Sequence, residues 1–248
     1  MYDISNMKAY YKFAGTVFEI ESHFDYFGKF AKDYMMDSDE FCRHHLKVSL
    51  GEIEEWKATH EDAKGFPLDY LETLVIHSKV ATILADENKF IFHGSCIAVD
   101  QYKNSYLFAA PSGVGKSTHV KLLKKMYGDR IKYINDDKPF VFNDNGIFYV
   151  FGSPWNGKER ISNNVEGILN GVFVVSRSNT NKVSKLSPKE AINHLIKQFY
   201  IPQGITEAIN ATNTLIKICE ELPIYLLEVN MEDGASKVSF DIMSKGVN

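Results

Sequence analysis

The sequence predicts an α/β protein with a mixed, twisted sheet, and three observations lead to this prediction. Short apolar segments with the spacing of strands recur between residues 90 and 175, and segments with helical spacing lie around them. Turn-forming residues at 143–146 join two of the strand segments directly, as in a hairpin. A glycine-rich turn at residues 110–115 stands between a strand segment and a helical segment. Strands that follow one another in hairpins and also alternate with helices indicate a mixed sheet.

The first part of the chain predicts a small α+β accessory segment. Residues 16–20 and 46–50 alternate as half-buried strands do, and phenylalanines with helical spacing lie between them. A glycine and a proline then mark a boundary. We therefore expect the accessory segment at residues 1–65 and the sheet-containing core at residues 66–248.

The core is expected to begin with a helix that Asp69 caps with the help of Glu72. Strands are expected at residues 90–93, 96–99, 106–109, 132–134, 140–142, 148–151 and 172–175. Helices are expected at residues 117–126, 187–201 and 206–222. The second of these has a capping box, formed by Ser187 and Glu190.

Composition excludes several classes of protein. A chain of 248 residues that is 44% hydrophobic and 24% charged is typical of a globular protein rather than a disordered or fibrous one. The formal net charge of −4 gives no excess of positive charge for binding nucleic acid or an anionic membrane, and no apolar run is long enough to span a bilayer. Three widely separated cysteines predict no disulfide framework, and the first residues show no signal peptide. We therefore expect a cytoplasmic protein.

The most specific motif is the stretch Ala110-Pro111-Ser112-Gly113-Val114-Gly115-Lys116-Ser117-Thr118. It has the strand–loop–helix setting of a P-loop, with Ala110 where the strict motif has glycine. The glycines let successive backbone N–H groups converge on one anion, and the start of the helix adds its positive dipole end. Lys116 would then contact the β- and γ-phosphates of a nucleotide, and the Ser117 hydroxyl would bind Mg²⁺. The alternative is a glycine-rich turn before a helix, with no ligand.

Two adjacent carboxylates, Asp136 and Asp137, end the next strand segment after this loop. Phosphoryl transfer to a hydroxyl needs a proton acceptor, and the metal needs a further oxygen ligand. Neighbouring side chains at a strand end can diverge, so one could face Mg²⁺ and the other a substrate hydroxyl. The alternative is a simple turn, since Asn135 and the two aspartates also have turn composition. His93 ends an earlier strand segment, and its distance from the loop stays open at this stage.

Three basic residues are further candidates for phosphate contacts. Lys158 and Arg160 lie on one loop, where fixed cations could offset charge on a transferring phosphoryl group, although surface positions are equally expected. Arg177 follows a strand segment, and its guanidinium suits bidentate binding of phosphate. Residues 42–45 contain a cysteine and two histidines, but neighbouring side chains on a strand point to opposite faces, which disfavours a zinc site.

Taken together, these residues resemble the HPr kinase/phosphorylase-like branch of the phosphoenolpyruvate carboxykinase-type P-loop proteins. The similarity rests on His93-Gly94, on Pro111-Ser112-Gly113-Val114-Gly115-Lys116-Ser117 and on Asp136-Asp137, in matching order and spacing over about residues 70–180. It implies a P-loop in a twisted mixed sheet that holds ATP, with Ser117 on Mg²⁺. It also implies that Asp137 acts as base toward a protein serine and that His93 lies in the active site. The chain looks closer still to small bacterial HPr-kinase-like proteins, a group with kinases that phosphorylate a peptide serine.

Three hypotheses follow from these motifs. The first is an ATP- and Mg²⁺-dependent kinase that transfers the γ-phosphoryl group to a serine of a protein or peptide, with Ser117 and Asp136 on the metal. The second keeps this chemistry but takes a small metabolite as acceptor. The third is a nucleotide-gated binding module that assists peptide modification, because the chain lacks the second, glutamate-containing metal motif of HPr kinases and Glu159 is the nearest acid. Homo-oligomer formation stays open.

Overall fold

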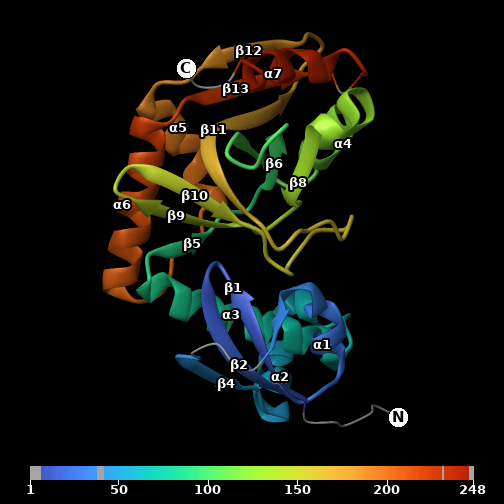
Figure 1. Cartoon of the computed structure of the whole chain (residues 1–248), viewed down its shortest axis with the longest axis vertical. Helices are drawn as coiled ribbons and strands as arrows, with labels where there is room; N and C mark the ends of the chain where they lie inside the picture. Colours follow the sequence, from blue (N-terminus) through green and yellow to red (C-terminus); the bar gives the residue numbers. More distant parts are fainter. Residues whose placement is uncertain (1–6, 38–41, 231, 246–248) are drawn as a thin grey trace. The chain divides into compact units, whose positions relative to one another are not determined.

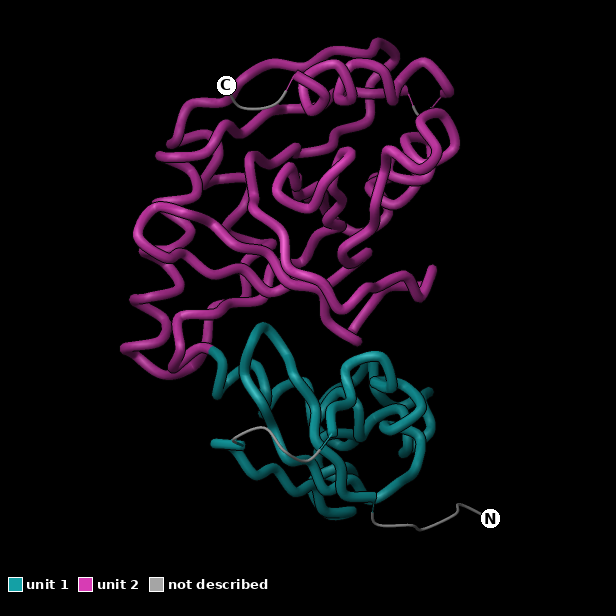
Figure 2. Tube along the Cα trace, in the orientation of Figure 1, with its two compact units in different colours: residues 1–84 teal, residues 85–248 magenta. Residues whose placement is uncertain are grey.

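The chain divides into two compact units, Met1–Leu84 and Ala85–Asn248 (Figures 1 and 2). The computed structural model describes residues 7–37, 42–230 and 232–245. The division falls later than the boundary expected at residue 65, because the helix that follows packs within the first unit. The carboxylate of Glu72 on this helix accepts hydrogen bonds from the backbone N–H groups of His23 and Phe24.

The first unit contains a four-stranded sheet in the order β3-β1-β2-β4. Its strands are β1 (Met7–Phe13), β2 (Thr16–Ser22), β3 (Met35–Met36) and β4 (His44–Lys47). Its helices are α1 (Tyr26–Phe30), α2 (Leu50–Thr59) and α3 (Leu68–Asp86), with 3₁₀ turns at Lys32–Tyr34 and Glu61–Ala63. Buried aromatic side chains, among them Tyr11, Phe13 and Phe18, form much of its core.

Two sequence predictions for this unit are corrected. The strand expected at residues 46–50 ends at Lys47, because Ser49 caps α2 through a capping box with Glu52. The expectation that Asp69 and Glu72 cap the next helix is wrong, because α3 begins at Leu68, before both residues. The Glu72 carboxylate instead accepts hydrogen bonds from the backbone of another segment. The strand expected at residues 16–20 is confirmed as part of β2.

The second unit is built on a nine-stranded mixed sheet, which confirms the predicted fold class. The strand order is β5-β9-β10-β11-β7-β6-β8, and β13 pairs with both β11 and β12. The strands are β5 (Lys89–Ile91), β6 (Ser95–Val99), β7 (Ser105–Ala109), β8 (Ile131–Asn135), β9 (Phe140–Asp144), β10 (Ile147–Phe151), β11 (Glu166–Arg177), β12 (Lys182–Lys185) and β13 (Ile224–Val229). The helices are α4 (Lys116–Tyr127), α5 (Pro188–Leu195), α6 (Ile205–Glu221) and α7 (Ala235–Met243), with 3₁₀ turns at Gly128–Arg130 and Ile196–Gln198.

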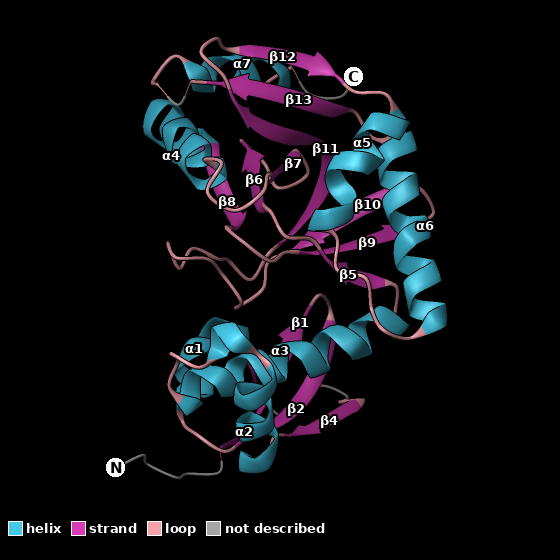
Figure 3. Cartoon of the chain, turned by 180° about the vertical axis from the view of Figure 1, so that it is seen from behind, coloured by secondary structure: helices cyan, strands magenta, loops and turns pink. Residues whose placement is uncertain are grey.

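Helices cover both faces of this sheet (Figure 3). The alternation along β6 shows the two layers: Cys96 and Ala98 belong to the cluster that includes α5 and α6, whereas Ile97 and Val99 belong to the cluster that includes α4 and α7. Burial on both faces explains why β6 and β7 are continuous apolar runs. Within the described ranges, no helix is long and apolar enough to cross a bilayer.

Strand directions bring several loops to one edge of the sheet. β7, β11 and β13 run parallel as neighbours, whereas β6 runs antiparallel to both β7 and β8. The carboxyl ends of β7, β8, β11 and β13 therefore lie on the same edge as the amino end of β6. In open α/β sheets, ligands bind outside the carboxyl ends of the strands.

Candidate functional site

The glycine-rich loop at residues 110–115 leaves the carboxyl end of β7 and leads directly into α4. Gly113 and Gly115 have φ angles of 79° and 119°, which lie in the left-handed region that favours glycine. Gly115 is the N-cap of α4 and supplies no side-chain cap, so the first N–H groups of the helix remain for another acceptor. A Cβ atom added at Gly113 would meet nothing within 4 Å, so the space in front of the loop is open.

Three of the predicted site residues, His93, Lys116 and Asp137, meet at this edge. Asp137 Oδ1 lies 3.2 Å from His93 Nε2 and 3.9 Å from Lys116 Nζ. The side chain of Lys116 is 11% exposed, that of Asp137 24% and that of His93 43%. The lysine therefore lies at the base of the group and the histidine at its solvent side. His93 precedes β6, Asp137 follows β8, and Lys116 begins α4 after the loop that follows β7.

Backbone hydrogen bonds hold this group in place. The N–H of Gly94 donates to the carbonyl oxygen of Asp137 at 2.8 Å, and the N–H of His93 donates to the carbonyl oxygen of Gln198 at 2.7 Å. The hydroxyl of Ser95 donates to the carbonyl oxygen of Asp136 at 2.8 Å. The segment that carries the histidine is thus tied to the segment that carries the two aspartates.

Asn135 is a positioning residue that sequence reasoning missed. It is fully buried, its Nδ2 donates to the carbonyl oxygen and the hydroxyl of Ser153, and its Oδ1 accepts from the N–H groups of Asp137 at 2.8 Å and Lys138 at 2.6 Å. This is the side-chain turn that asparagine forms with its own backbone. The turn that the composition of residues 135–137 indicated is therefore present, and it fixes the backbone of Asp137.

Asp136 contacts a different segment, the loop that contains Gly157. Its Oδ1 accepts a hydrogen bond from the N–H of Gly157 at 2.6 Å, and its own N–H donates to the carbonyl oxygen of Ile161. A Cβ atom added at Gly157 would lie 3.3 Å from Asp136 Oδ2, which shows how closely the loop approaches. The two adjacent carboxylates therefore have different partners in the structure.

The two carboxylates have pKa shifts in opposite directions. Burial raises the pKa of Asp136, and the nearby charge of Asp137 raises it further. The hydrogen bond from Gly157 opposes this shift. Burial alone would also raise the pKa of Asp137, but the hydrogen bond with His93 and the charges of Lys138 and Lys116 bring it below its usual value. Burial lowers the pKa of Lys116, although the charges of the two aspartates oppose this shift. A pair of groups shifted apart in this way is typical of an acid–base site.

The other basic candidates differ in what they contact. Arg177 donates from Nε to the carbonyl oxygen of Val114 at 2.9 Å and from a terminal guanidinium nitrogen to that of Gly113 at 2.7 Å, so it holds the glycine-rich loop itself. Lys158 and Arg160 are exposed on the loop that Asp136 holds. Between them, Glu159 forms an ion pair of 2.7 Å with Lys121 on α4.

The oxygen donors at this edge fit Mg²⁺. Ser117 follows Lys116 in the first turn of α4, and Asp136 directly follows β8 at the same edge of the sheet. Mg²⁺ in proteins is usually held by one or two carboxylates together with substrate phosphates and water, and the donor types at this edge match that set. Among the described residues, no group of three or more His, Cys, Asp or Glu side chains could hold a metal.

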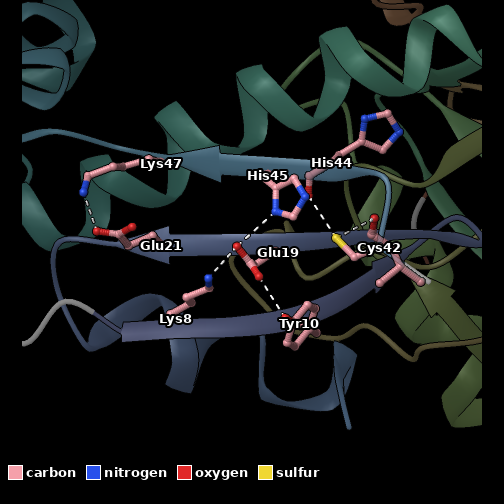
Figure 4. Close-up of polar contacts among 9 residues, drawn as sticks. Lys8, Tyr10, Glu19, Glu21, Cys42, His44, His45 and Lys47 are labelled. Atoms are coloured by element: carbon pink, nitrogen blue, oxygen red, sulfur yellow. Dashed lines mark hydrogen bonds and ion pairs between the residues drawn. The ribbon is translucent and has the colours of Figure 1, made fainter. Parts of the chain in front are cut away.

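The cysteine and histidines at 42–45 lie in the first unit and have other contacts (Figure 4). His45 Nδ1 lies 3.0 Å from Glu19 Oε1, while the His44 ring lies 5.3 Å from the ring of Phe18. Glu19 also contacts Lys8 and Tyr10, and Lys8, His45 and Tyr10 together lower the pKa of its carboxyl to about 2. This network links three neighbouring strands of the first sheet.

No family model matches the chain, and no curated protein matches it. Among solved structures, the chain is similar to the HPr(Ser) kinase/phosphatase from Coxiella burnetii, at 9% sequence identity and a TM-score of 0.35. That match covers 62% of this chain and 97% of the other. The relationship is structural and distant.

Proposed function

We propose that the protein is a kinase that uses ATP and Mg²⁺ and transfers the γ-phosphoryl group to a hydroxyl, here a serine of a protein or peptide. One observation carries this proposal: the Asp137 carboxylate contacts both the lysine of the glycine-rich loop and His93. A loop that converges N–H groups on phosphate is thus paired with a carboxylate that can accept a proton.

The proposed roles follow from the geometry. The loop amides and Lys116 bind the phosphates, and the buried lysine offsets the charge that develops on the transferred group. The acceptor oxygen bonds to the γ-phosphorus, the bond from that phosphorus to the β–γ bridging oxygen breaks, and ADP leaves. The hydroxyl proton passes to Asp137, whose lowered pKa keeps it ionised and ready to accept at neutral pH. His93 orients that carboxylate through the 3.2 Å contact.

Ser117 and Asp136 would hold Mg²⁺, which supplies charge neutralisation at the phosphates when bound. Lys158 and Arg160 are exposed on the loop that Asp136 holds, and we assign them to the outer side of the phosphate site.

The test uses ATP labelled in the γ-phosphate, with Mg²⁺, the protein and an extract of its source cells. We expect label on a protein or peptide, and we expect Asp137→Asn to lower the transfer rate by about 10²–10⁴-fold, the contribution of a positioned proton acceptor. ATP affinity should stay within a few-fold. Asp144→Asn, the same change at an exposed residue of the β9–β10 hairpin, is the matched control and should have no effect.

Other outcomes would identify the other hypotheses. If the unchanged protein transfers the label to a small molecule and Asp137→Asn does not, the acceptor is a metabolite. Tight ATP binding without transfer would refute the kinase and favour a nucleotide-gated binding module. Unchanged transfer by Asp137→Asn would refute the role of this carboxylate.

A further inference from the structure

The four-stranded sheet of the first unit has one apolar face and one charged face. The apolar face holds buried side chains such as Tyr11, whose ring packs against Phe27 of α1. Side chains alternate along a strand, so the strand pairing places another set of residues on the opposite face. That set includes three basic residues and two acids, namely Lys8, His45, Lys47, Glu19 and Glu21.

The basic side chains form the outer layer of this charged face (Figure 4). Those of Lys8, His45 and Lys47 are 57–68% exposed, whereas those of Glu19 and Glu21 are 14% and 31% exposed. Each acid lies under the basic groups that it contacts, with Glu19 Oε1 2.8 Å from Lys8 Nζ and Glu21 Oε1 2.5 Å from Lys47 Nζ. A partner that approaches this face therefore meets positive charge first, although the unit as a whole has more Asp and Glu than Lys and Arg.

Strand β4, which carries His45 and Lys47, is an edge of this sheet. It pairs with β2, and no strand of the described ranges pairs with its outer side. The N–H of Val48 donates to the carbonyl oxygen of Glu21 at 3.2 Å, so the backbone groups of His45 and Lys47 alternate to the outer side. The carbonyl oxygen of Lys47 accepts a hydrogen bond from Lys79 Nζ at 2.8 Å, which adds another cation at this edge. Edge strands of this kind can pair with an extended segment of another chain.

The edge and the charged face together define the partner. A segment that pairs with β4 places every second side chain on the charged face, directly beside His45 and Lys47. Side chains of opposite charge on neighbouring strands stabilise a sheet, whereas like charges destabilise it. The segment should therefore carry acidic side chains at alternate positions. Pairing along the edge also needs backbone N–H and C=O groups, which a peptide has and a nucleic acid lacks.

We propose that β4 binds an extended acidic peptide segment as an added strand, with acidic side chains at alternate positions beside His45 and Lys47. This inference goes beyond the proposed function. It uses no residue of the second unit, so it can fail while the kinase proposal holds, and the reverse.

The test uses two short synthetic peptides of the same composition and the full chain. One has glutamate at every second position with threonine between, and the other has all its glutamates in one block. The unchanged protein should bind the alternating peptide at least fivefold more tightly, measured by fluorescence anisotropy, and hydrogen exchange at the N–H groups of His45 and Lys47 should become slower. Lys47→Glu should weaken this binding at least fivefold. Lys64→Glu, the same charge change in an exposed ion pair with Glu61 outside the sheet, is the matched control and should stay within twofold.

Several results would overturn the inference: no binding of the alternating peptide, equal affinity for the two peptides, or unaltered hydrogen exchange at His45 and Lys47 in the complex. Tighter binding of a single-stranded RNA that displaces the peptide would also overturn it. If Lys47→Glu disturbs the sheet because it places two acids side by side, Lys47→Gln decides. Lys47→Gln should weaken binding of the alternating peptide about threefold, and an unaltered affinity would refute the assignment.

Discussion

Arg177 illustrates how one side chain can hold a loop from another element. The sequence suggested that its guanidinium binds phosphate, but the guanidinium donates to the carbonyl oxygens of Gly113 and Val114. Gly113 and Gly115 have left-handed backbone conformations, and the arginine satisfies two carbonyl groups of the same loop. Arg177 is therefore a positioning residue for the phosphate loop.

We predict that Arg177→Met weakens binding of ATP and of tripolyphosphate by the same factor, about tenfold, because hydrogen bonds from a charged group contribute about 1.5–3 kcal/mol. Arg177→Lys should recover only part of the affinity, since an ammonium cannot reproduce the planar two-point contact. Titration with both probes measures the factors, and hydrogen exchange of residues 110–115 should become faster. Unaltered affinity for both probes would contradict this role.

At the scale of the element, capping boxes mark where two helices begin. Ser187 with Glu190 starts α5, as the sequence predicts, and Ser49 with Glu52 starts α2. In both boxes the serine hydroxyl accepts from the N–H of the glutamate, and the glutamate accepts from the N–H of the serine. One helix lies in each unit, so the same change can be compared in both.

We expect Ser187→Ala to destabilise the second unit and Ser49→Ala the first, each by about 1 kcal/mol, the usual value of a lost N-cap. The chain has only two tryptophans, with Trp56 in the first unit and Trp155 in the second. Urea unfolding in a Trp56→Phe background follows the second unit, and a Trp155→Phe background follows the first. An unchanged midpoint in the unit that carries the mutation would show that its cap adds nothing.

At the scale of the whole molecule, the chain has two compact units, and the first contains a buried acid, Glu72 on α3. Burial raises the pKa of Glu72 to about 7, against the hydrogen bonds from the backbone of His23 and Phe24 and with a smaller contribution from the charge of Asp69. The folded state thus binds this proton more tightly than the unfolded state, whose pKa is about 4.3. The contribution of protonated Glu72 to stability is fully present below the unfolded-state pKa, and it is lost as the pH rises through the folded-state pKa of about 7.

We therefore predict that the urea midpoint of the first unit, read from Trp56 in the Trp155→Phe background, falls between pH 5 and pH 8. Glu72→Gln cannot ionise and should remove this part of the pH dependence. Asp69→Asn, the same kind of change at the partly exposed neighbour, is the control and should leave most of it in place. Two results would contradict the prediction. One is a urea midpoint that rises between pH 5 and pH 8 in the protein that retains Glu72, and the other is a pH dependence of the midpoint that Glu72→Gln does not alter.

Much of the second unit could be predicted from local pattern. The buried strands β6, β7 and β8, the helix α4 that ends at Gly128, and the Asn145–Gly146 turn with its φ angles of 51° and 90° all follow from residue type and spacing. The helix α7 and the strand β13 were missed, because their short segments are stabilised by packing against α4 and β11 rather than by a strong local signal. The cap predicted for Glu72 was wrong because its partners lie far away in the sequence. A glutamate near the start of a helix has the pattern of a capping residue, and only the tertiary structure shows its contacts with the backbone at residues 23 and 24.

The sequence by itself determined the fold class and the glycine-rich loop between a strand and a helix, and it supplied the candidate residues for the proposed chemistry. These depend on neighbouring residues along the chain, where side-chain spacing and backbone preference act directly. Only the tertiary structure decided that His93 and Lys116 meet at Asp137 and that Arg177 holds the loop. Those relations depend on strand order and direction, which arise from pairing between segments far apart in the chain.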